Sequence, residues 1–134
     1  FVYYSITNLV SNSGVVATDT TGVGTARRVL AAAGYGSTGQ ALFAYGNTGS
    51  DTAISNLVSN TGVVAADVSG VGTARASVAA AGYGGDKAIF GYGTTGSNVS
   101  ITNLVTNLGV VGSDVSGVGT ARFGLAAAGY STSA

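Results

Sequence analysis

Short apolar segments alternate along the chain with connections rich in Gly, Ser, Thr, Asn and Asp. Four kinds of segment recur in a constant order: RASVAAAGY (75–83), KAIFGYG (87–93), VSITNLV (99–105) and the segment opening with GVV at 109–111. Apolar segments this short, bounded by turn residues, predict strands joined by tight turns. The Ala triplets contain good helix formers. Each is nevertheless too short for a stable isolated helix and is closed by Gly, so we expect strands there.

The same phrases return at a fixed spacing. Asn8, Asn56 and Asn103 lie 48 and then 47 residues apart, and Tyr35, Tyr83 and Tyr130 repeat those two spacings. Such self-similarity predicts one supersecondary unit per repeat, stacked on its neighbours. Four strands in 40–50 residues are typical of one β-propeller blade. The predicted fold is therefore all-β, with four-stranded propeller-type blades in an incomplete ring. A β-solenoid is the alternative, although its rungs are usually shorter and less interrupted by hairpin turns.

The expected organisation is one repeat domain over residues 1–134. It comprises a partial blade (1–26), two blades (27–74 and 75–121) and the opening strand of a further blade (122–134). Because propellers usually need 4–8 blades to close, we expect either association between copies or further repeats in a longer polypeptide. In an associated pair, the last strand of each chain would join the opening strands of the other.

From each repeated Arg onward, the sequence resembles a kelch-type blade: "AR" starts the first strand, "AAAGYGG" ends it, and "DKAIFGYG" follows. The copy AAAGYGSTGQALFAYG replaces the glycine pair, and the late-blade Trp of that family is missing. The phrases TNLVSN-GVV--D--GVGTAR and AAAGYGGDKAIFGYG also resemble tandem repeats in virion proteins of tailed phages. This resemblance implies a fibre, an adhesin or another protein of a particle surface.

Composition removes several classes of function. The chain has no Cys, His, Trp, Met, Pro or Glu. Ser-His-Asp triads, thiol nucleophiles and His- or Cys-ligated metals are therefore impossible within it, and we expect no enzyme activity, metal or cofactor. Five basic residues balance five Asp, so no basic footprint for nucleic acid exists. No apolar run approaches the roughly 20 residues that cross a bilayer, so membrane insertion is not expected.

Polar residues that keep repeat register are candidates for a site. Each repeated Asp precedes an Arg by eight residues, and one Asn recurs in each third strand. The predicted roles are structural: an Asx-type turn for Asp, an anchor to strand-end carbonyls or carboxylate for Arg, and a hydrogen bond holding a blade connection for Asn. The alternatives are a calcium-binding Asp ring, an anion-binding Arg ring and a sugar-binding Asn rim. The residues are Asp19, Asp67, Asp114, Arg27, Arg75, Arg122, Asn8, Asn56 and Asn103.

The repeated glycines and the aromatic residues each allow a structural and a functional interpretation. The GVGT phrases at Gly22, Gly70 and Gly117 lack a Walker Lys, so their glycines predict turns instead of a phosphate loop. Phe43 and Phe90 lie mid-strand and are predicted core. Five Tyr flank turns, where a ring could stack on a sugar: Tyr35, Tyr83, Tyr130, Tyr45 and Tyr92.

These observations predict a non-enzymatic structural and adhesive repeat protein of a virus particle or extracellular fibre. Identical blades would present identical loops, and weak contacts to a cell-surface glycan would add through effective concentration. The alternative is a purely structural filament or capsid-decoration subunit that binds no ligand.

Overall fold

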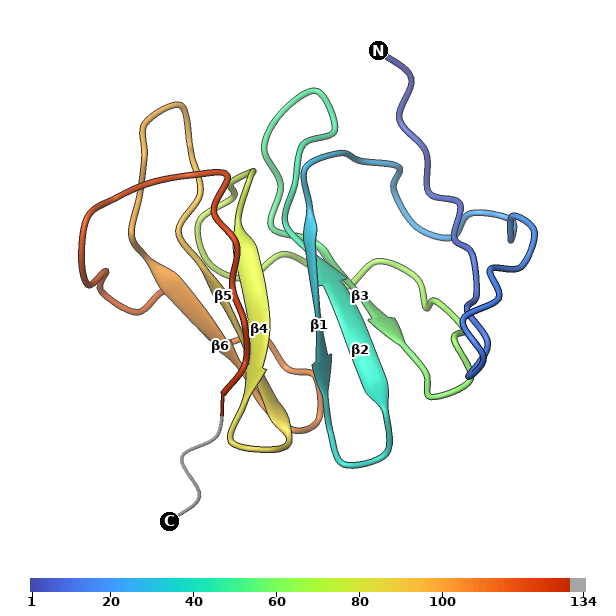
Figure 1. Ribbon diagram of the computed structural model, residues 1–134. Helices are drawn as coiled ribbons and strands as arrows, with labels where there is room; N and C mark the ends of the chain where they lie inside the picture. Colours follow the sequence, from blue (N-terminus) through green and yellow to red (C-terminus); the bar gives the residue numbers. More distant parts are fainter. Residues whose placement is uncertain (131–134) are drawn as a thin grey trace.

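The computed structural model describes residues 1–130 and builds them from strands and connections, with no helix in that range. Six strands form two antiparallel sheets, ordered β1-β2-β3 and β4-β5-β6 (Figure 1). The strands are β1 (Ala31–Tyr35), β2 (Gln40–Ala44), β3 (Ser55–Val58), β4 (Ala79–Tyr83), β5 (Lys87–Gly91) and β6 (Thr102–Val105). The all-β prediction is confirmed, and the first two Ala triplets are strands. Within residues 1–130, nothing helical is long and apolar enough to span a bilayer.

Each sheet has two distinct faces, because successive side chains of a strand point to opposite sides. In the first sheet Phe43 lies opposite Ala32 and Asn56, whereas Leu42 lies opposite Ala33 and Leu57. We call these sides the phenylalanine face and the leucine face. The second sheet has matching registers: its phenylalanine face carries Ala80, Phe90 and Asn103, and its leucine face carries Ala81, Ile89 and Leu104.

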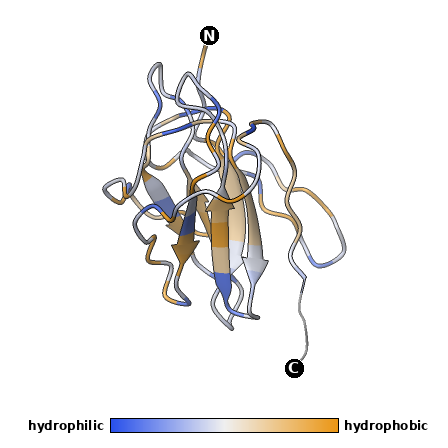
Figure 2. Ribbon diagram, turned by 90° about the vertical axis from the view of Figure 1, so that its left-hand side faces the viewer, coloured by the Kyte–Doolittle hydropathy of each residue, from blue (hydrophilic) through white to orange (hydrophobic). Residues whose placement is uncertain are grey.

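The core lies between the two sheets. The leucine face of the first sheet supplies Leu42 and Ala44, both fully buried, and the phenylalanine face of the second supplies Ala88 and Phe90. The Tyr45 ring, just beyond β2, packs on Phe90 with centroids 5.6 Å apart. Burial of such apolar area is the main stabilising contribution. Figure 2 shows hydrophobic residues concentrated on the strands.

Close approach of the innermost segments explains the small residues of the AAAGY phrase. β1 packs against β4, and in Figure 1 the red segment that precedes the C-terminus runs beside β4. A Cβ added to Gly82 would lie 3.6 Å from the Gly34 carbonyl oxygen, and one added to Gly129 would lie 2.6 Å from the Gly82 carbonyl oxygen. The approach at Gly82 is an ordinary van der Waals contact, whereas at Gly129 the backbone of Gly82 leaves no room for a side chain.

The segment that follows β3 differs from the expected fourth strand. It contacts β3 through two isolated bridges, Val58 with Val64 and Ser55 with Val68. A step of three residues along β3 thus corresponds to a step of four along the later segment, so one extra residue interrupts the ladder, as in a β-bulge. The Asn56 side chain donates to the carbonyl of Ala65 at 3.1 Å inside this interruption. Each sheet therefore has three strands plus an irregular fourth segment.

The third Ala triplet, Ala126–Ala128, lies outside the six strands. Its counterparts in β1 and β4 are paired along their length by β2 and β5. A strand needs such a partner for its backbone hydrogen bonds. The predicted opening strand 122–134 is described only to residue 130, and its remaining residues lie outside the described part of the chain.

Candidate functional site

A polar cluster closes one end of the first sheet. Arg27 is buried, and its Nε donates to the Tyr45 carbonyl at 2.9 Å while Nη1 donates to the Thr25 carbonyl at 3.2 Å. Its Nη2 donates to Asn56 Oδ1 at 2.7 Å. Burial lowers the pKa of Arg27, and the nearby Asp67 carboxylate partly offsets that effect. A buried guanidinium is tolerated because its donors are satisfied.

Asp67 completes this first polar cluster. Its carboxylate accepts the Asn56 amide at 2.8 Å, the Thr25 backbone N–H at 3.1 Å and the Thr25 hydroxyl at 2.6 Å. The pKa of Asp67 is lowered, first by the hydrogen bond from the Thr25 hydroxyl and then by the bonds from the Asn56 and Thr25 amides and by the Arg27 charge. Desolvation acts in the opposite direction but is outweighed. The cluster joins the segment that precedes β1 to the segment that follows β3.

A second polar cluster has the same construction. Arg75 Nε donates to the Tyr92 carbonyl at 2.8 Å, and Asp114 accepts the Thr73 hydroxyl at 2.6 Å and the Asn103 amide at 2.9 Å. Desolvation raises the pKa of Asp114, but the bonds from Thr73 and Asn103 outweigh it and the pKa is lowered. Arg75 Nη2 and Asn103 Oδ1, which correspond to the bonded pair in the first cluster, are buried without a hydrogen bond among the described residues.

The Tyr that follows the second strand of each sheet stacks under the Arg of the next repeat. The Arg75 guanidinium carbon lies 4.1 Å from the centroid of the Tyr45 ring, and Arg122 lies 4.0 Å from that of Tyr92. Both distances are within cation–π range. The Tyr45 hydroxyl donates to the Val71 carbonyl in the GVGT phrase. Burial raises the Tyr45 pKa, and Arg75 partly offsets this effect.

The GVGT phrases form the connections that hold these contacts. Gly24 has φ of 75°, and a Cβ there would collide with the side chains of Asn56 and Asp67; Gly72 has φ of 76° and meets Asn103 and Asp114 in the same way. Glycine is required at both positions, because φ is positive and because a side chain would collide with the Asn and the Asp. The Thr after each of these glycines, Thr25 or Thr73, donates to the Asp carboxylate.

The Asp carboxylates are therefore used differently from the expected Asx turns. Asp67 and Asp114 accept from Thr25 and Thr73, which lie 42 and 41 residues earlier in the chain. Local sequence gave no signal for Thr25 and Thr73 as partners. Arg27 and Arg75 contact carbonyls at strand ends, and Asn56 and Asn103 bond the irregular fourth segment. Among residues 1–130, no three His, Cys, Asp or Glu side chains gather at one point.

The outermost copies of these residues make only part of each cluster. Asn8 donates to Ala17 O at 3.1 Å and to Asp19 Oδ1 at 2.8 Å, as Asn56 does to its own partners. Arg122 Nη1 donates to Thr120 O at 3.0 Å. Asn8, Asp19 and Arg122 are all exposed, unlike the buried Arg27, Arg75, Asn56 and Asn103.

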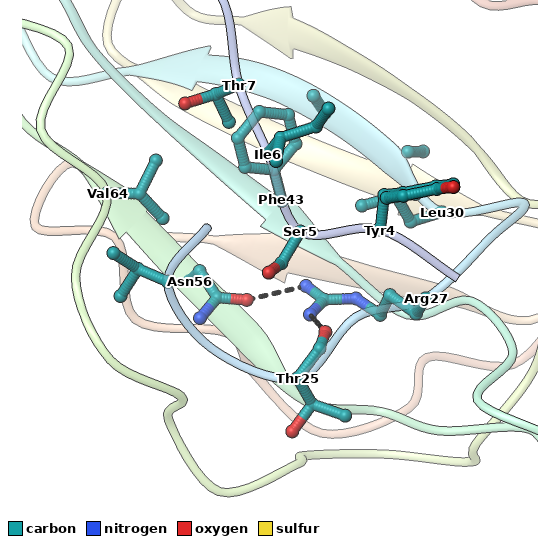
Figure 3. Close-up of a pocket in the computed structure, with 13 residues that line it drawn as sticks. Tyr4, Ser5, Ile6, Thr7, Thr25, Arg27, Leu30, Phe43, Asn56 and Val64 are labelled. Atoms are coloured by element: carbon teal, nitrogen blue, oxygen red, sulfur yellow. Dashed lines mark hydrogen bonds between the residues drawn. The ribbon is translucent and has the colours of Figure 1, made fainter. Parts of the chain in front are cut away.

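A cavity of about 360 Å³ lies beside the first cluster, on the phenylalanine face of the first sheet (Figure 3). Phe43, Leu30 and Val64 line it together with Arg27, and the N-terminal residues Tyr4 to Thr7 cover one side. In the second sheet the corresponding Phe90 is fully buried under the first sheet. The cavity is thus the uncovered equivalent of an internal sheet junction.

Three of the five candidate Tyr converge at the other end of the inner strands. Tyr35, Tyr83 and Tyr130 line one depression of about 460 Å³. Tyr35 is 7% exposed, Tyr83 is half-buried and Tyr130 is 82% exposed. Tyr45 is fully buried and Tyr92 half-buried, with both rings stacked under an Arg.

Polar groups that sequence reasoning missed share this depression. Gln40, Asp86 and Lys87 line it, and Lys87 Nζ lies 2.8 Å from Asp86 Oδ1. The hydrogen bond from Lys87 lowers the Asp86 pKa, and the same bond raises that of Lys87. Gln40 and Lys87 begin β2 and β5 directly opposite Tyr35 and Tyr83, and Asp86 ends the GGD turn. The packing of β1 against β4 brings the two hairpin ends together.

No protein-family model matches the chain, and no curated protein is significantly similar to it.

Proposed function

We propose that this chain is a non-enzymatic structural and adhesive repeat protein of a virus particle or extracellular fibre. Each sequence repeat of about 47 residues is one propeller-type blade, with three strands and the irregular fourth segment. The support is that two sheets spaced by 47 or 48 residues have matching registers and closing clusters. The repeated Asp, Arg and Asn hold these blades together.

The adhesive site in this proposal is the depression lined by Tyr35, Tyr83 and Tyr130, and a cell-surface glycan is its ligand. The observation that carries the proposal is the convergence of these three repeat-equivalent residues on one hollow. A sugar offers an apolar ring face for Tyr130 and Tyr83, and hydroxyls for the polar groups around them. Copies arrayed on a particle would add weak contacts through effective concentration.

Carbohydrate binding by the arrayed protein tests this site. A glycan array probed with multivalent chain should show binding that Tyr130→Ala abolishes. Tyr4→Ala, which removes an exposed Tyr at the distant cavity, is the matched control and should retain binding. Loss of binding in both variants, or no glycan recognised by the unaltered chain, would count against the adhesive site.

The alternative is a purely structural subunit whose sheet ends contact only protein. One observation favours it: Tyr45 and Tyr92 are held under Arg75 and Arg122, so these aromatic residues serve packing. A chain that binds no glycan but forms regular polymers would support this alternative.

A further inference from the structure

The two ends of the described chain carry complementary halves of one polar cluster. Asn8 and Asp19 reproduce the Asn–Asp half at distances that match the internal clusters, and Thr120 and Arg122 reproduce the Thr–Arg half. Among the described residues, the Thr120 N–H and hydroxyl donate to no carboxylate, and Asp19 accepts only from Asn8. Two kinds of bond are lacking within residues 1–130: those between the halves, and the bond from Arg122 Nε, whose internal counterparts donate to the Tyr45 and Tyr92 carbonyls.

Glycine contacts show the same complementarity. An added Cβ would meet the Asp and Asn of the internal clusters at Gly24 and Gly72, whereas at Gly119 it would meet only the Tyr92 hydroxyl, at 3.6 Å. Gly119 has φ of 78°, nearly that of its two counterparts, so the backbone is already in the same conformation. The space beside Gly119 is therefore shaped for an Asn–Asp pair.

Apolar contacts repeat the pattern on the leucine faces. Leu9 packs against Gly62, and Leu57 packs against Gly109, in the turn before the next fourth segment. Leu104, the next in the series, is 44% exposed, and Gly14, the turn glycine nearest the N-terminus, has open space beside it. Leu104 thus lacks the turn that covers Leu57, and Gly14 lacks the Leu that covers Gly62.

We propose that a second copy of this chain docks head to tail, with its Asn8–Asp19 half completing the Thr120–Arg122 half of the first. Asp19 of the second copy accepts from Thr120, Asn8 accepts from Arg122, and the Gly14 turn covers Leu104. The blade so formed takes its first segment from one copy and its third and fourth segments from the other, and neither copy supplies a counterpart of β2 or β5 within its described residues. This inference rests on the repeat architecture of the proposed function, and a Gly14 turn seated on Leu104 would also approach Tyr83, as Gly109 approaches both Leu57 and Tyr35.

The two halves lie at opposite ends of one copy and do not meet within it. In Figure 1 the blue N-terminal segment flanks the first sheet, and the orange-to-red loop near residue 120 flanks the second. The contact is heterologous, so repeated docking gives a closed ring or an open filament. Asp19 and Arg122 bring opposite charges to it, as Asp67 and Arg27 do internally.

The experiment uses one variant for each half. Asp19→Ala removes the acceptor and leaves Thr120 intact, whereas Gly119→Ala places a methyl group where the Asn–Asp pair would dock and leaves Asp19 intact. Sedimentation velocity should show concentration-dependent association of the unaltered chain. Each variant alone should associate at least about tenfold more weakly, since an unpaired charge or a clash at such a contact costs more than about 1.4 kcal/mol.

Mixing the two variants tests the head-to-tail arrangement. Asp19 of the Gly119→Ala chain still fits Thr120 of the Asp19→Ala chain, so the mixture should form a 1:1 complex that grows no further. Circular dichroism and urea unfolding of each variant at a dilution where it is monomeric should show an intact fold. A monomeric unaltered chain at about 100 μM, or a mixture with no complex while both variants are folded, would overturn the proposal. The glycan array compares the unaltered chain with Tyr130→Ala and does not measure association, so failure of the docking and failure of the glycan site give different results.

Discussion

The Thr25 hydroxyl donates to the Asp67 carboxylate at 2.6 Å across 42 residues of sequence. Thr73 and Asp114 repeat this bond at the same distance. Each pair joins the segment that precedes a sheet to the segment that follows it, so the bond closes a unit. In a chain with only five acidic residues, this use of repeated Asp explains why the residue keeps its register.

Removal of the Asp67 carboxylate should lower the free energy of unfolding. Asp67→Ala leaves the Thr25 donors and the Asn56 amide without their acceptor, and we expect a loss of about 1–2 kcal/mol because the carboxylate is solvent-exposed. Urea unfolding measures the loss. Asp19→Ala, studied where the chain is monomeric, is the control and should change stability by less than about 0.5 kcal/mol. Equal losses would contradict a closing role for Asp67.

Acid should destabilise the fold through the same two carboxylates. The pKa values of Asp67 and Asp114 are lowered in the folded chain. Their contribution is therefore complete above the unfolded Asp pKa of about 3.9 and is lost as pH falls through the folded values. Unfolding followed from pH 6 to pH 2 should show stability falling below about pH 4. The double variant Asp67→Asn with Asp114→Asn should flatten this dependence; an unchanged slope would assign it to other groups.

The two equivalent Phe residues should differ in their importance. Phe90 is fully buried between the sheets, whereas Phe43 faces the cavity of Figure 3 and is half-buried. We expect Phe90→Ala to cost about 3–5 kcal/mol and Phe43→Ala distinctly less, because less apolar area is lost. Urea midpoints of the monomeric chains give the comparison. A larger loss at Phe43 would contradict the assignment of the core to the junction between the sheets.

The two equivalent Arg residues provide a further matched pair. Arg75 is fully buried, stacks on Tyr45 and donates to two carbonyls, while Arg122 is exposed. Arg75→Met should lower stability by about 3 kcal/mol or more, because two carbonyls lose their donors and the Tyr45 ring loses its cover. Arg122→Met should cost less than about 1 kcal/mol in the monomer. Similar losses would mean that the neighbouring sheet does not determine the contribution of the Arg.

Local pattern was sufficient to predict the six strands that form, although it also predicted one at the third Ala triplet, where no strand forms within the described residues. The Ala triplets of β1 and β4, closed by Gly34 and Gly82, and the mid-strand position of Phe90 follow from segment length and alternation. The fourth strand was expected as regular, but one extra residue between Val64 and Val68 interrupts it. That extra residue has no signature in the apolar pattern.

The site depended on contacts that sequence does not encode locally. Tyr45 flanks a turn, which predicts an exposed ring, yet Arg75 from the following repeat covers it. The gathering of Tyr35, Tyr83 and Tyr130 depends on how closely the inner segments pack, which at the last of them requires Gly129. Repeat register identified the correct residues, while the packing of one repeat on the next determines what each of them does.

Amide hydrogen exchange at the three equivalent Thr residues tests the central claim most directly. In dilute solution the Thr25 and Thr73 amides, which donate to Asp67 and Asp114, should be protected, and the Thr120 amide should exchange freely. As concentration rises and copies associate, Thr120 should become protected as Asp19 of another copy reaches it. Fast exchange at Thr25 and Thr73 in the folded chain, or free exchange at Thr120 in an associated state, would contradict the account.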